Sequence, residues 1–445
     1  MQTIFMKFRN FIFILLFWQV TLFGQSGFQF ENNKDKIAIP FQLINNLVFI
    51  PLEVNGVPLN FLLDSGVDET ILLSLDDKEE VSFHSVQKIK LKGLGSNEPI
   101  EGLKSSNNIL SYKGLVDRHH DVFIVLDQSF NFSSHIGIPV NGIIGYNFFK
   151  DNIVEVNYDK KKVFVYKDTK KIRKKMLKRS ASSIMIERNK PYLISDVAIA
   201  NEQVPSKLLI DIGNSDALWL FENKEKKINM PNIKFEDYLG KGFSGDINGF
   251  RSKIGSVKIN SFTFENPIVA FPDSISIKSV NKVVDRVGSL GGEILKRFNI
   301  IFDYSNNKIY FSKSHYFNDP FLYNMSGIEL QNDGMQWVQE TVNLQTVNLD
   351  NSYDGNGNKA QNDFKLKFTL KPIFSIASVR KNSPAEASGL QVGDLIVSIN
   401  NVEAYRYTLQ SINNLLKSEE GKWLYFEVER NGKLLKCKFQ LKSIL

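Results

Sequence analysis

Two aspartates, each delivered by an apolar segment into a glycine turn, are the residues best suited to chemistry in this chain. Asp64 follows Phe61–Leu63, and Asp211 follows Leu208–Ile210, 147 positions later. If folding brings them about 3 Å apart, the two carboxyl groups cannot both ionise, because close like charge raises one pKa. Such a pair holds one proton and can activate a water molecule to attack an amide carbonyl.

The residues after each aspartate indicate how the two turns support the acids. Gly66 and Gly213 allow tight turns whose backbone N–H groups can donate to a charged carboxylate. Ser65 carries a hydroxyl that can form a hydrogen bond, whereas Ile212, at the equivalent place, carries none.

A second pair of motifs repeats in the same register as the two aspartates. Gly142–Gly145 and Gly288–Gly291 lie 146 positions apart, within one residue of the spacing of the acids. Each motif is followed by a short helical pattern, a strand, a polar turn and another strand. Order and spacing kept over such a distance indicate a duplicated domain rather than chance motifs.

Strand and turn patterns place the first aspartate at the end of a hairpin. Strands over 47–54 and 57–63 are joined by Asn55-Gly56, and the second strand ends at Asp64. Further strands are expected over 86–91 and 122–126. Glycine-rich segments 93–97 and 240–249 are expected at mobile hairpins, one in each repeat.

The C-terminal part of the chain predicts a third, smaller unit. Ser383–Glu386 is a capping box with proline at the first helical position. A strand is expected over 374–379 before it, and a turn at Asn332–Gly334 opens the unit. The polar stretch 348–362 is expected to be a mobile loop. At 445 residues, the chain has room for roughly three domains.

The N-terminal residues are typical of a signal peptide, here residues 1–25. Lys7 and Arg9 precede an apolar run from Phe11 to Phe23, which is shorter than the roughly 20 residues of a membrane span. No later stretch is long and apolar enough to cross a bilayer. The lone Cys437 cannot form an internal disulfide, and we expect it to pack in a core.

The excess positive charge is concentrated in one segment. Residues 160–179 hold eleven Lys or Arg and one acid, while the whole chain has a net charge of +7. Nucleic-acid binding would require such charge spread over a folded surface with aromatic residues, so we expect no nucleic-acid partner and a solvated connector between the repeats. The five histidines show no metal-ligand spacing, and no cofactor or metal is expected.

The paired Asp64-Ser65-Gly66 and Asp211-Ile212-Gly213 turns, with their downstream glycine motifs, resemble the pepsin and retropepsin superfamily of aspartic proteases. The whole arrangement resembles the exported bacterial aspartyl protease family with a C-terminal PDZ domain. This resemblance implies a mainly β protein with two retropepsin-like β-barrel lobes forming a pepsin-like unit. The implied boundaries are lobe 1 at 35–167, a basic linker at 168–182, lobe 2 at 183–315 and a PDZ domain at 325–445.

The same resemblance implies that a hydroxyl after each acid forms a hydrogen bond to the turn of the other lobe. Because Ile212 has no hydroxyl, one of these two paired bonds, worth about 1 kcal/mol net, is expected to be missing.

The resemblance also implies the roles of the site residues. Asp64 and Asp211 would be the catalytic dyad of an aspartic endopeptidase, supported by Ser65, Gly66, Ile212 and Gly213, with a polypeptide substrate in the cleft between the lobes. The PDZ domain would add a peptide C-terminus or internal segment beside an exposed edge strand. We expect that edge at Phe374, Ser375 and Ile376.

Three alternatives remain open on the sequence. Gly213–Asp216 is similar to the nucleophile loop of trypsin-like proteases, but Asp216 stands where glycine is needed, and His119-His120 lacks the expected context. A non-catalytic, peptide-binding envelope scaffold with a degenerate dyad would explain Ile212 and Asn214. A packing or regulatory role without a ligand is open for the PDZ domain. Export is expected to the periplasm, the cell surface or the medium.

Overall fold

The computed structural model describes most of the chain beyond its N-terminal segment. The residues described are 27–31, 33–73, 75, 80–91, 99–126, 131–176, 178–200, 202–242, 245–277, 283–342 and 365–445. The expected signal peptide, the glycine turn at 93–97 and the loop at 348–362 lie outside these residues. Those three expectations therefore remain predictions.

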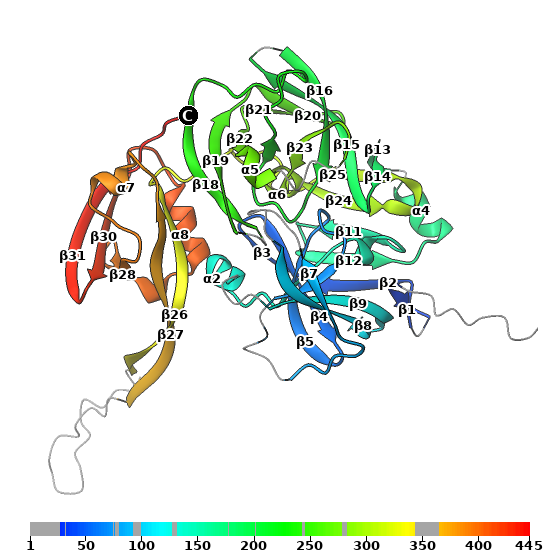
Figure 1. Cartoon of the computed structure of the whole chain (residues 1–445), viewed down its shortest axis with the longest axis horizontal. Coiled ribbons are helices and arrows are strands. Elements are labelled where there is room, and N and C mark those ends of the chain that lie inside the picture. Colours follow the sequence, from blue (N-terminus) through cyan, green and yellow to red (C-terminus); the bar gives the residue numbers. More distant parts are fainter. Residues whose placement is uncertain are drawn as a thin grey trace, which may run out of the picture.

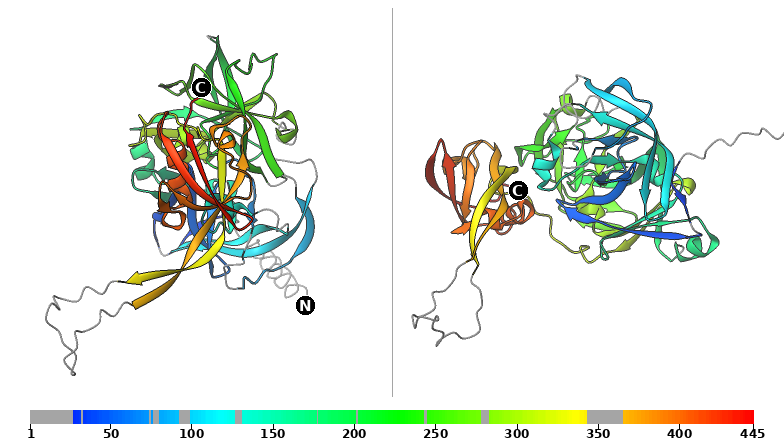
Figure 2. Two further views of the ribbon diagram at one scale, coloured as in Figure 1. Left: turned by 90° about the vertical axis from the view of Figure 1, so that its left-hand side faces the viewer. Right: turned by 90° about the horizontal axis from the view of Figure 1, so that it is seen from below.

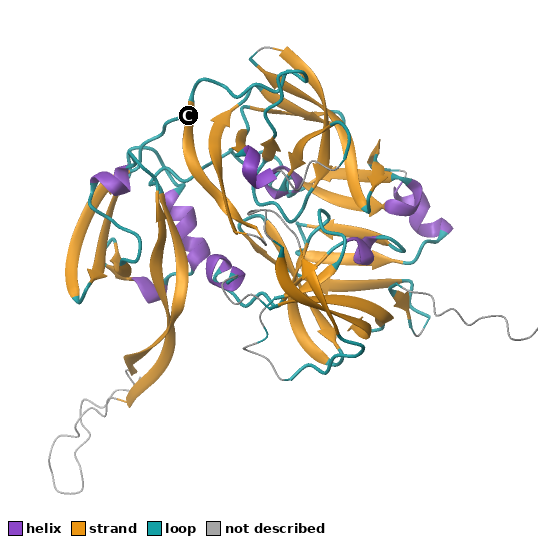
Figure 3. Cartoon of the chain, in the orientation of Figure 1, coloured by secondary structure: helices purple, strands orange, loops and turns teal. Residues whose placement is uncertain are grey.

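The described residues form two β lobes side by side and a third, smaller unit beside them (Figure 1). Strands dominate all three units, and the helices are short (Figure 3). In the described ranges, the strands of lobe 1 form a nine-stranded sheet and those of lobe 2 a ten-stranded sheet. A six-stranded sheet combines strands from both lobes, and the third unit has a six-stranded sheet of its own.

The first lobe contains a set of short strands and two short helices. They are β1 (Gln29–Phe30), β2 (Lys36–Pro40), β3 (Gln42–Ile44), β4 (Leu47–Val54), β5 (Val57–Leu63), β6 (Thr70–Leu72), β7 (Gln87–Leu91), β8 (Ile100–Tyr112), β9 (Leu115–Val125), α2 (Phe132–Ile136), β10 (Gly142–Ile144), α3 (Tyr146–Phe149), β11 (Ile153–Asn157) and β12 (Lys162–Tyr166). The expected hairpin of 47–54 and 57–63 is confirmed.

The basic segment is more ordered than a simple connector. It forms α4 (Lys170–Met176) and leads into β13 (Ser180–Ser183), which pairs with a strand of lobe 2. Met176 is buried. The expectation of a solvated linker over this whole segment is therefore wrong, because one face of α4 packs on the protein.

The second lobe repeats the order of the first. It contains β14 (Met185–Glu187), β15 (Lys190–Ile199), β16 (Glu202–Ile210), β17 (Leu218–Leu220), β18 (Lys234–Gly242), β19 (Gly245–Lys253), β20 (Ser256–Ile259), β21 (Phe262–Glu265), β22 (Ile268–Pro272), α5 (Ser274–Ile277), β23 (Arg286–Leu290), α6 (Gly292–Leu295), β24 (Phe298–Asp303), η1 (Tyr304–Asn306) and β25 (Lys308–Lys313). The expected hairpin around 240–249 is the end of the β18–β19 pair.

The third unit contains two very long strands and a capped helix. Its elements are β26 (Ile328–Val342), β27 (Lys365–Val379), α7 (Pro384–Ala387), β28 (Leu395–Ile399), β29 (Val402–Glu403), η2 (Ala404–Arg406), α8 (Leu409–Leu416), β30 (Trp423–Arg430) and β31 (Lys433–Gln440). Ser383 caps α7 by accepting from the Glu386 N–H at 3.2 Å, as the capping-box pattern predicts. The expected turn at Asn332–Gly334 is wrong: these residues form a bulge within β26.

Equivalent strand crossings position the two aspartates. β10 runs parallel to β5 and antiparallel to β6, and the Asp64 N–H donates to the Ile144 carbonyl at 2.9 Å. In lobe 2, β23 lies between β16 and β17 in the same way, and the Asp211 N–H donates to the Leu290 carbonyl at 2.9 Å. The glycine motifs therefore supply the strands that fix the ends of β5 and β16.

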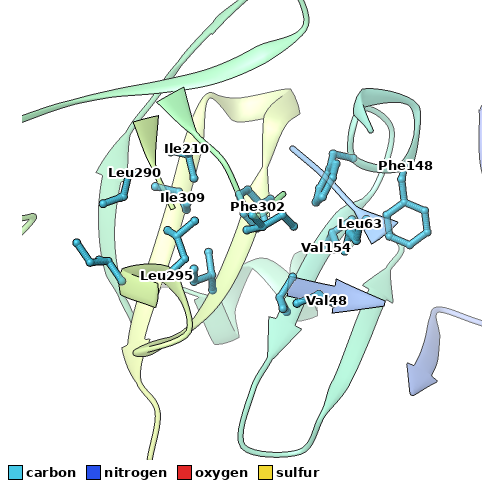
Figure 4. Packing of buried hydrophobic residues seen from close by; sticks show 14 of the residues in the cluster. Val48, Leu63, Phe148, Val154, Ile210, Leu290, Leu295, Phe302 and Ile309 are labelled. Atoms are coloured by element: carbon cyan, nitrogen blue, oxygen red, sulfur yellow. The ribbon is translucent and has the colours of Figure 1, made fainter. Parts of the chain in front are cut away.

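One apolar core runs through both lobes. β11 of lobe 1 pairs with β24 of lobe 2, and Val154 lies opposite Phe302. Figure 4 shows Phe302 between residues of lobe 1, such as Leu63, and residues of lobe 2, such as Ile210. Because both aspartates follow strands anchored in this core, the lobes hold them in a fixed relation.

Truncating the core at Phe302 should destabilise both lobes together. Phe302 is fully buried, and its ring lies 5.1 Å from that of Phe149 of lobe 1. We expect Phe302→Ala to lower the free energy of unfolding by about 3–5 kcal/mol. Chemical denaturation followed by fluorescence would measure it. The control Ile233→Ala, at a side chain 69% exposed, should change little; separate unfolding of the lobes in Phe302→Ala would contradict a shared core.

Candidate active site

Asp64 lies at the end of β5 and is 9% exposed. The Gly66 N–H donates to its Oδ1 at 2.7 Å. Burial raises the pKa of Asp64 well above its usual range, and the neighbouring Asp211 raises it further. Burial and the neighbouring carboxyl group therefore favour the protonated form of Asp64.

Asp211 lies opposite Asp64 at the end of β16, and the two carboxyl groups are hydrogen-bonded to each other. Burial also raises the pKa of Asp211, but the positive charge of Arg286 opposes that shift. The Gly213 N–H and the hydrogen bond from Asp64 stabilise the charged form as well. The pair therefore carries one proton, with the negative charge favoured on Asp211.

The turn glycines leave the room that the two carboxyl groups occupy. A Cβ atom on Gly213 would lie 2.1 Å from the Asp64 Cγ, and one on Gly66 would lie 3.0 Å from the Asp211 Oδ1. Each glycine thus packs against the aspartate of the opposite lobe. A side chain at Gly213 would displace the Asp64 carboxyl group.

Ser65 connects the two turns. Its hydroxyl donates to the Ile210 carbonyl at 2.7 Å and accepts from the Ile212 N–H at 3.1 Å. Ile212 is fully buried in the core and has no hydroxyl for an equivalent pair of bonds. Apart from the hydrogen bond between the two carboxyl groups, the side-chain connection between the turns is therefore one-sided, because Ser65 supplies it and Ile212 cannot.

Two cations near the dyad were missed by the sequence analysis. Arg286 begins β23, donates from Nη2 to the Ser289 Oγ at 2.7 Å, and lowers the pKa of Asp211. Lys190 of lobe 2 forms an ion pair with Asp68 of lobe 1 at 3.5 Å and lowers the pKa of both dyad aspartates. Arg286 lies two residues before Gly288, and this position was the one feature of the sequence that placed a cation near the second aspartate. The sequence does not reveal the direction of the Arg286 side chain.

Tyr304 is a further buried polar neighbour of the site. Its hydroxyl has no hydrogen-bond partner among the described residues. Burial raises its pKa well above the usual range, and Asp64 contributes to the shift. The phenol therefore stays neutral, and its ring stacks on that of Phe149 at 5.4 Å.

An ion-pair chain leads from the second turn to the β18–β19 hairpin. Arg251 of β19 binds the Asp216 Oδ1 at 2.7 Å and the Asp237 Oδ2 at 2.6 Å. The Trp219 Nε1 donates to the other oxygen of Asp216 at 2.7 Å. Because Asp216 lies five residues after Asp211, these contacts hold the second aspartate turn against the hairpin.

The same chain continues into the third unit. The Arg380 Nη1 lies 3.5 Å from the Asp237 Oδ1, and the guanidinium lies 4.3 Å from the Phe235 ring centroid. Burial raises the pKa of Glu329 to about 7, and Asp237 adds to this shift. The third unit is therefore packed on the hairpin of lobe 2 through buried, charged side chains.

The expected edge strand of the third unit is wrong. Phe374, Ser375 and Ile376 lie in the interior of the sheet, because β27 pairs with β26 on one side and with β28 on the other. The Ile376 N–H also donates to the Asp394 carbonyl at 3.0 Å. The edge strands of this sheet are β26 and β31, and the bulge in β26 interrupts the strand pattern that the sequence shows there.

The histidines form no nucleophile–base pair with the second turn in the contacts of the described residues. The His120 Nδ1 binds the Asp117 Oδ2 and its Nε2 binds the Thr70 Oγ1, both at 2.7 Å, inside lobe 1. The ranges described contain no group of three or more His, Cys, Asp and Glu side chains that could hold a metal ion.

The mainly β chain combines an aspartyl protease domain with a PDZ domain near its C-terminus. Residues 50–148 match the family model of aspartyl proteases, and residues 375–430 match that of the PDZ domain. A crystal structure of an aspartic proteinase from Irpex lacteus is similar at 12% identity and a TM-score of 0.43, over 64% of this chain and 99% of that one. No curated protein matches the chain.

Removing the Ser65 hydroxyl should weaken the connection between the turns. Ser65→Ala leaves the buried Ile212 N–H without its acceptor, and we expect a loss of about 1–3 kcal/mol in the free energy of unfolding. Urea titration would measure it. Ser65→Thr keeps the hydroxyl and serves as the control; equal stability of Ser65→Ala and the native protein would contradict the assignment.

Removing the positive charge of Arg286 should alter the pH dependence of the dyad. Since Arg286 lowers the pKa of Asp211, Arg286→Met should raise that pKa, so that the charged form is lost at a higher pH. The acidic limb of a pH–rate profile for peptide cleavage should then move to higher pH. Arg286→Lys keeps the charge and should leave the limb in place, and an unmoved limb in Arg286→Met would contradict the role of the charge.

Proposed function

We propose that this protein is an aspartic endopeptidase that hydrolyses peptide bonds with a water molecule activated between Asp64 and Asp211. The observation that carries the proposal is the hydrogen-bonded, buried pair of carboxyl groups, one from each lobe, which share a proton. Burial raises the pKa of both groups, so the singly protonated pair persists to a higher pH than ordinary carboxyl groups would allow.

The proton positions assign a role to each acid. Charged Asp211 takes a proton from the water, and the water oxygen attacks the carbonyl carbon of the substrate. Asp64 gives its proton to the carbonyl oxygen as the tetrahedral intermediate forms. A proton then moves from Asp211 to the leaving nitrogen and the C–N bond breaks. As the carbonyl re-forms, one hydroxyl of the intermediate gives its proton to Asp64. The dyad thus ends each cycle with one proton.

We also propose that the protein is exported and that its PDZ domain binds peptide or regulates access to the cleft. The sequence of residues 1–25 supports export to the periplasm, the cell surface or the medium. The part of the chain that the structure describes contains no helix with the length and apolar character to span a membrane. The ion pairs through Arg380 and Asp237 support a PDZ domain that acts on the hairpin beside the cleft.

A non-catalytic scaffold is the second candidate, because Ile212 makes the connection between the two turns one-sided. Such a scaffold would bind peptide without cleaving it. The dyad geometry favours the enzyme, since a peptide-binding scaffold has no need for two buried, hydrogen-bonded carboxyl groups from opposite lobes.

Replacing either dyad acid separates the two candidates. Asp64→Asn and Asp211→Asn should each lower kcat/KM for a peptide library by about 10³-fold or more, because each removes one acid–base function. Cleavage at acidic to neutral pH and binding of a pepstatin-type inhibitor would be measured. Asp35→Asn, at an exposed aspartate, is the control. Undiminished cleavage by both variants, or an uncleaved library with the native protein, would reject the endopeptidase.

A further inference from the structure

A two-stranded ribbon projects from the PDZ domain away from both lobes (Figures 1 and 2). It is formed by residues 335–342 of β26 and residues 365–372 of β27, which are paired antiparallel. The bulge between Asn332 and Met335 separates the ribbon from the part of β26 that belongs to the PDZ sheet. The ribbon is therefore a distinct extension of the sheet.

One face of the ribbon is apolar and exposed. Trp337 is 70% exposed, Phe368 59%, Met335 54% and Leu370 49%. In the register, Trp337 lies opposite Leu370, and Phe368 lies opposite Gln339, two residues further along the same face. Four large apolar side chains thus form one continuous surface, and an exposed apolar surface of this kind marks an interaction site.

The β26 strand of the ribbon is an edge strand of its sheet. In the described chain, β26 has β27 as its only strand partner. β27 in turn pairs with β28 at Ser375, beyond the ribbon. The outer edge of β26 therefore presents N–H and C=O groups that another extended chain could pair with.

This open edge decides between a polypeptide and a lipid partner. Hydrocarbon offers no hydrogen bonds, so a sheet edge with unpaired N–H and C=O groups is excluded from the interior of a bilayer. An extended polypeptide satisfies the same groups by adding a strand, while its apolar side chains cover those of Trp337 and Phe368. The combination of apolar face and open edge therefore fits a polypeptide.

The base of the PDZ domain is less accessible than the ribbon. Helix α2 of lobe 1 packs against β26, and a Cβ atom on Gly137, just after α2, would lie 2.9 Å from the Leu409 Cβ of α8. In the loop before β26, the Asn324 Oδ1 already accepts from the N–H groups of Ser326 at 3.0 Å and Gly327 at 3.3 Å. The end of the PDZ domain nearest the lobes is thus covered by α2 of lobe 1, and the N–H groups of its loop are bonded to Asn324. The ribbon at the opposite end remains exposed.

We propose that the ribbon captures extended, apolar segments of the polypeptide substrate by strand addition to its edge and contact with its apolar face. This inference rests on the proposed protease function and names the class of substrate, namely non-native or unstructured chains rather than short peptides. A long chain held by the ribbon is confined near the protease lobes, which raises its effective concentration at the cleft.

The test measures binding and cleavage separately. Binding uses the full chain with Asp64→Asn, so that nothing is cleaved, and a fluorescently labelled, permanently unfolded carboxymethylated protein followed by anisotropy. Trp337→Thr with Phe368→Thr should raise the Kd for that chain at least tenfold. Threonine suits strands, so the ribbon is kept. In the active background, kcat/KM for an eight-residue peptide should change by less than about twofold, because a short peptide does not reach the ribbon.

Trp423→Thr is the matched control, because Trp423 is 48% exposed on β30 of the same domain, outside the ribbon. It should bind the unfolded protein as Asp64→Asn alone does. Thermal unfolding confirms that each variant is folded. An unchanged Kd for the unfolded protein in the ribbon variant would overturn the inference. If the ribbon substitutions instead abolished binding to anionic vesicles, or self-association in sedimentation, and left polypeptide binding unchanged, the inference would also be overturned. Polypeptide binding by a native protein that cleaves no substrate would reject the protease function and leave the ribbon assignment intact.

Discussion

The repulsion between two buried carboxyl groups is the constraint on which the rest of this structure depends. Asp64 and Asp211 would separate or take up two protons if the surroundings allowed it. The core shared by both lobes holds the ends of β5 and β16, and the hydroxyl of Ser65 fixes the two turns to each other. Arg286 then biases the remaining negative charge toward Asp211.

The two aspartate turns contribute unequally to this arrangement. The turn of lobe 1 supplies the connecting hydroxyl of Ser65, while the turn of lobe 2 contributes backbone groups and the buried side chain of Ile212. In lobe 2, ion pairs take over part of the support, because Asp216 is held by Arg251 of the neighbouring hairpin. The turn of lobe 2, which lacks a hydroxyl at Ile212, is therefore the turn that the ion pair of Asp216 with Arg251 supports.

Those charged contacts also connect the dyad with the PDZ domain. Asp237 binds Arg251 of the hairpin and Arg380 of the PDZ domain, so the PDZ domain is packed on the element beside the second aspartate turn. Glu329 of the PDZ domain lies near the same contact, and burial together with the charge of Asp237 raises its pKa to about 7. The PDZ domain and the hairpin are thus joined by buried, charged side chains.

The sequence by itself determined the two aspartate turns, their repetition in register, the strands that deliver them, and the capped helix of the third unit. These are local features, set by strand alternation, glycine turns and capping residues within a few positions. Only the tertiary structure decided that β27 is an inner strand and β26 an edge strand, that the basic segment packs as α4 and β13, and that Arg286 and Lys190 lie beside the dyad. Strand partners and the direction of long side chains depend on residues far apart in the chain, and no local pattern encodes them.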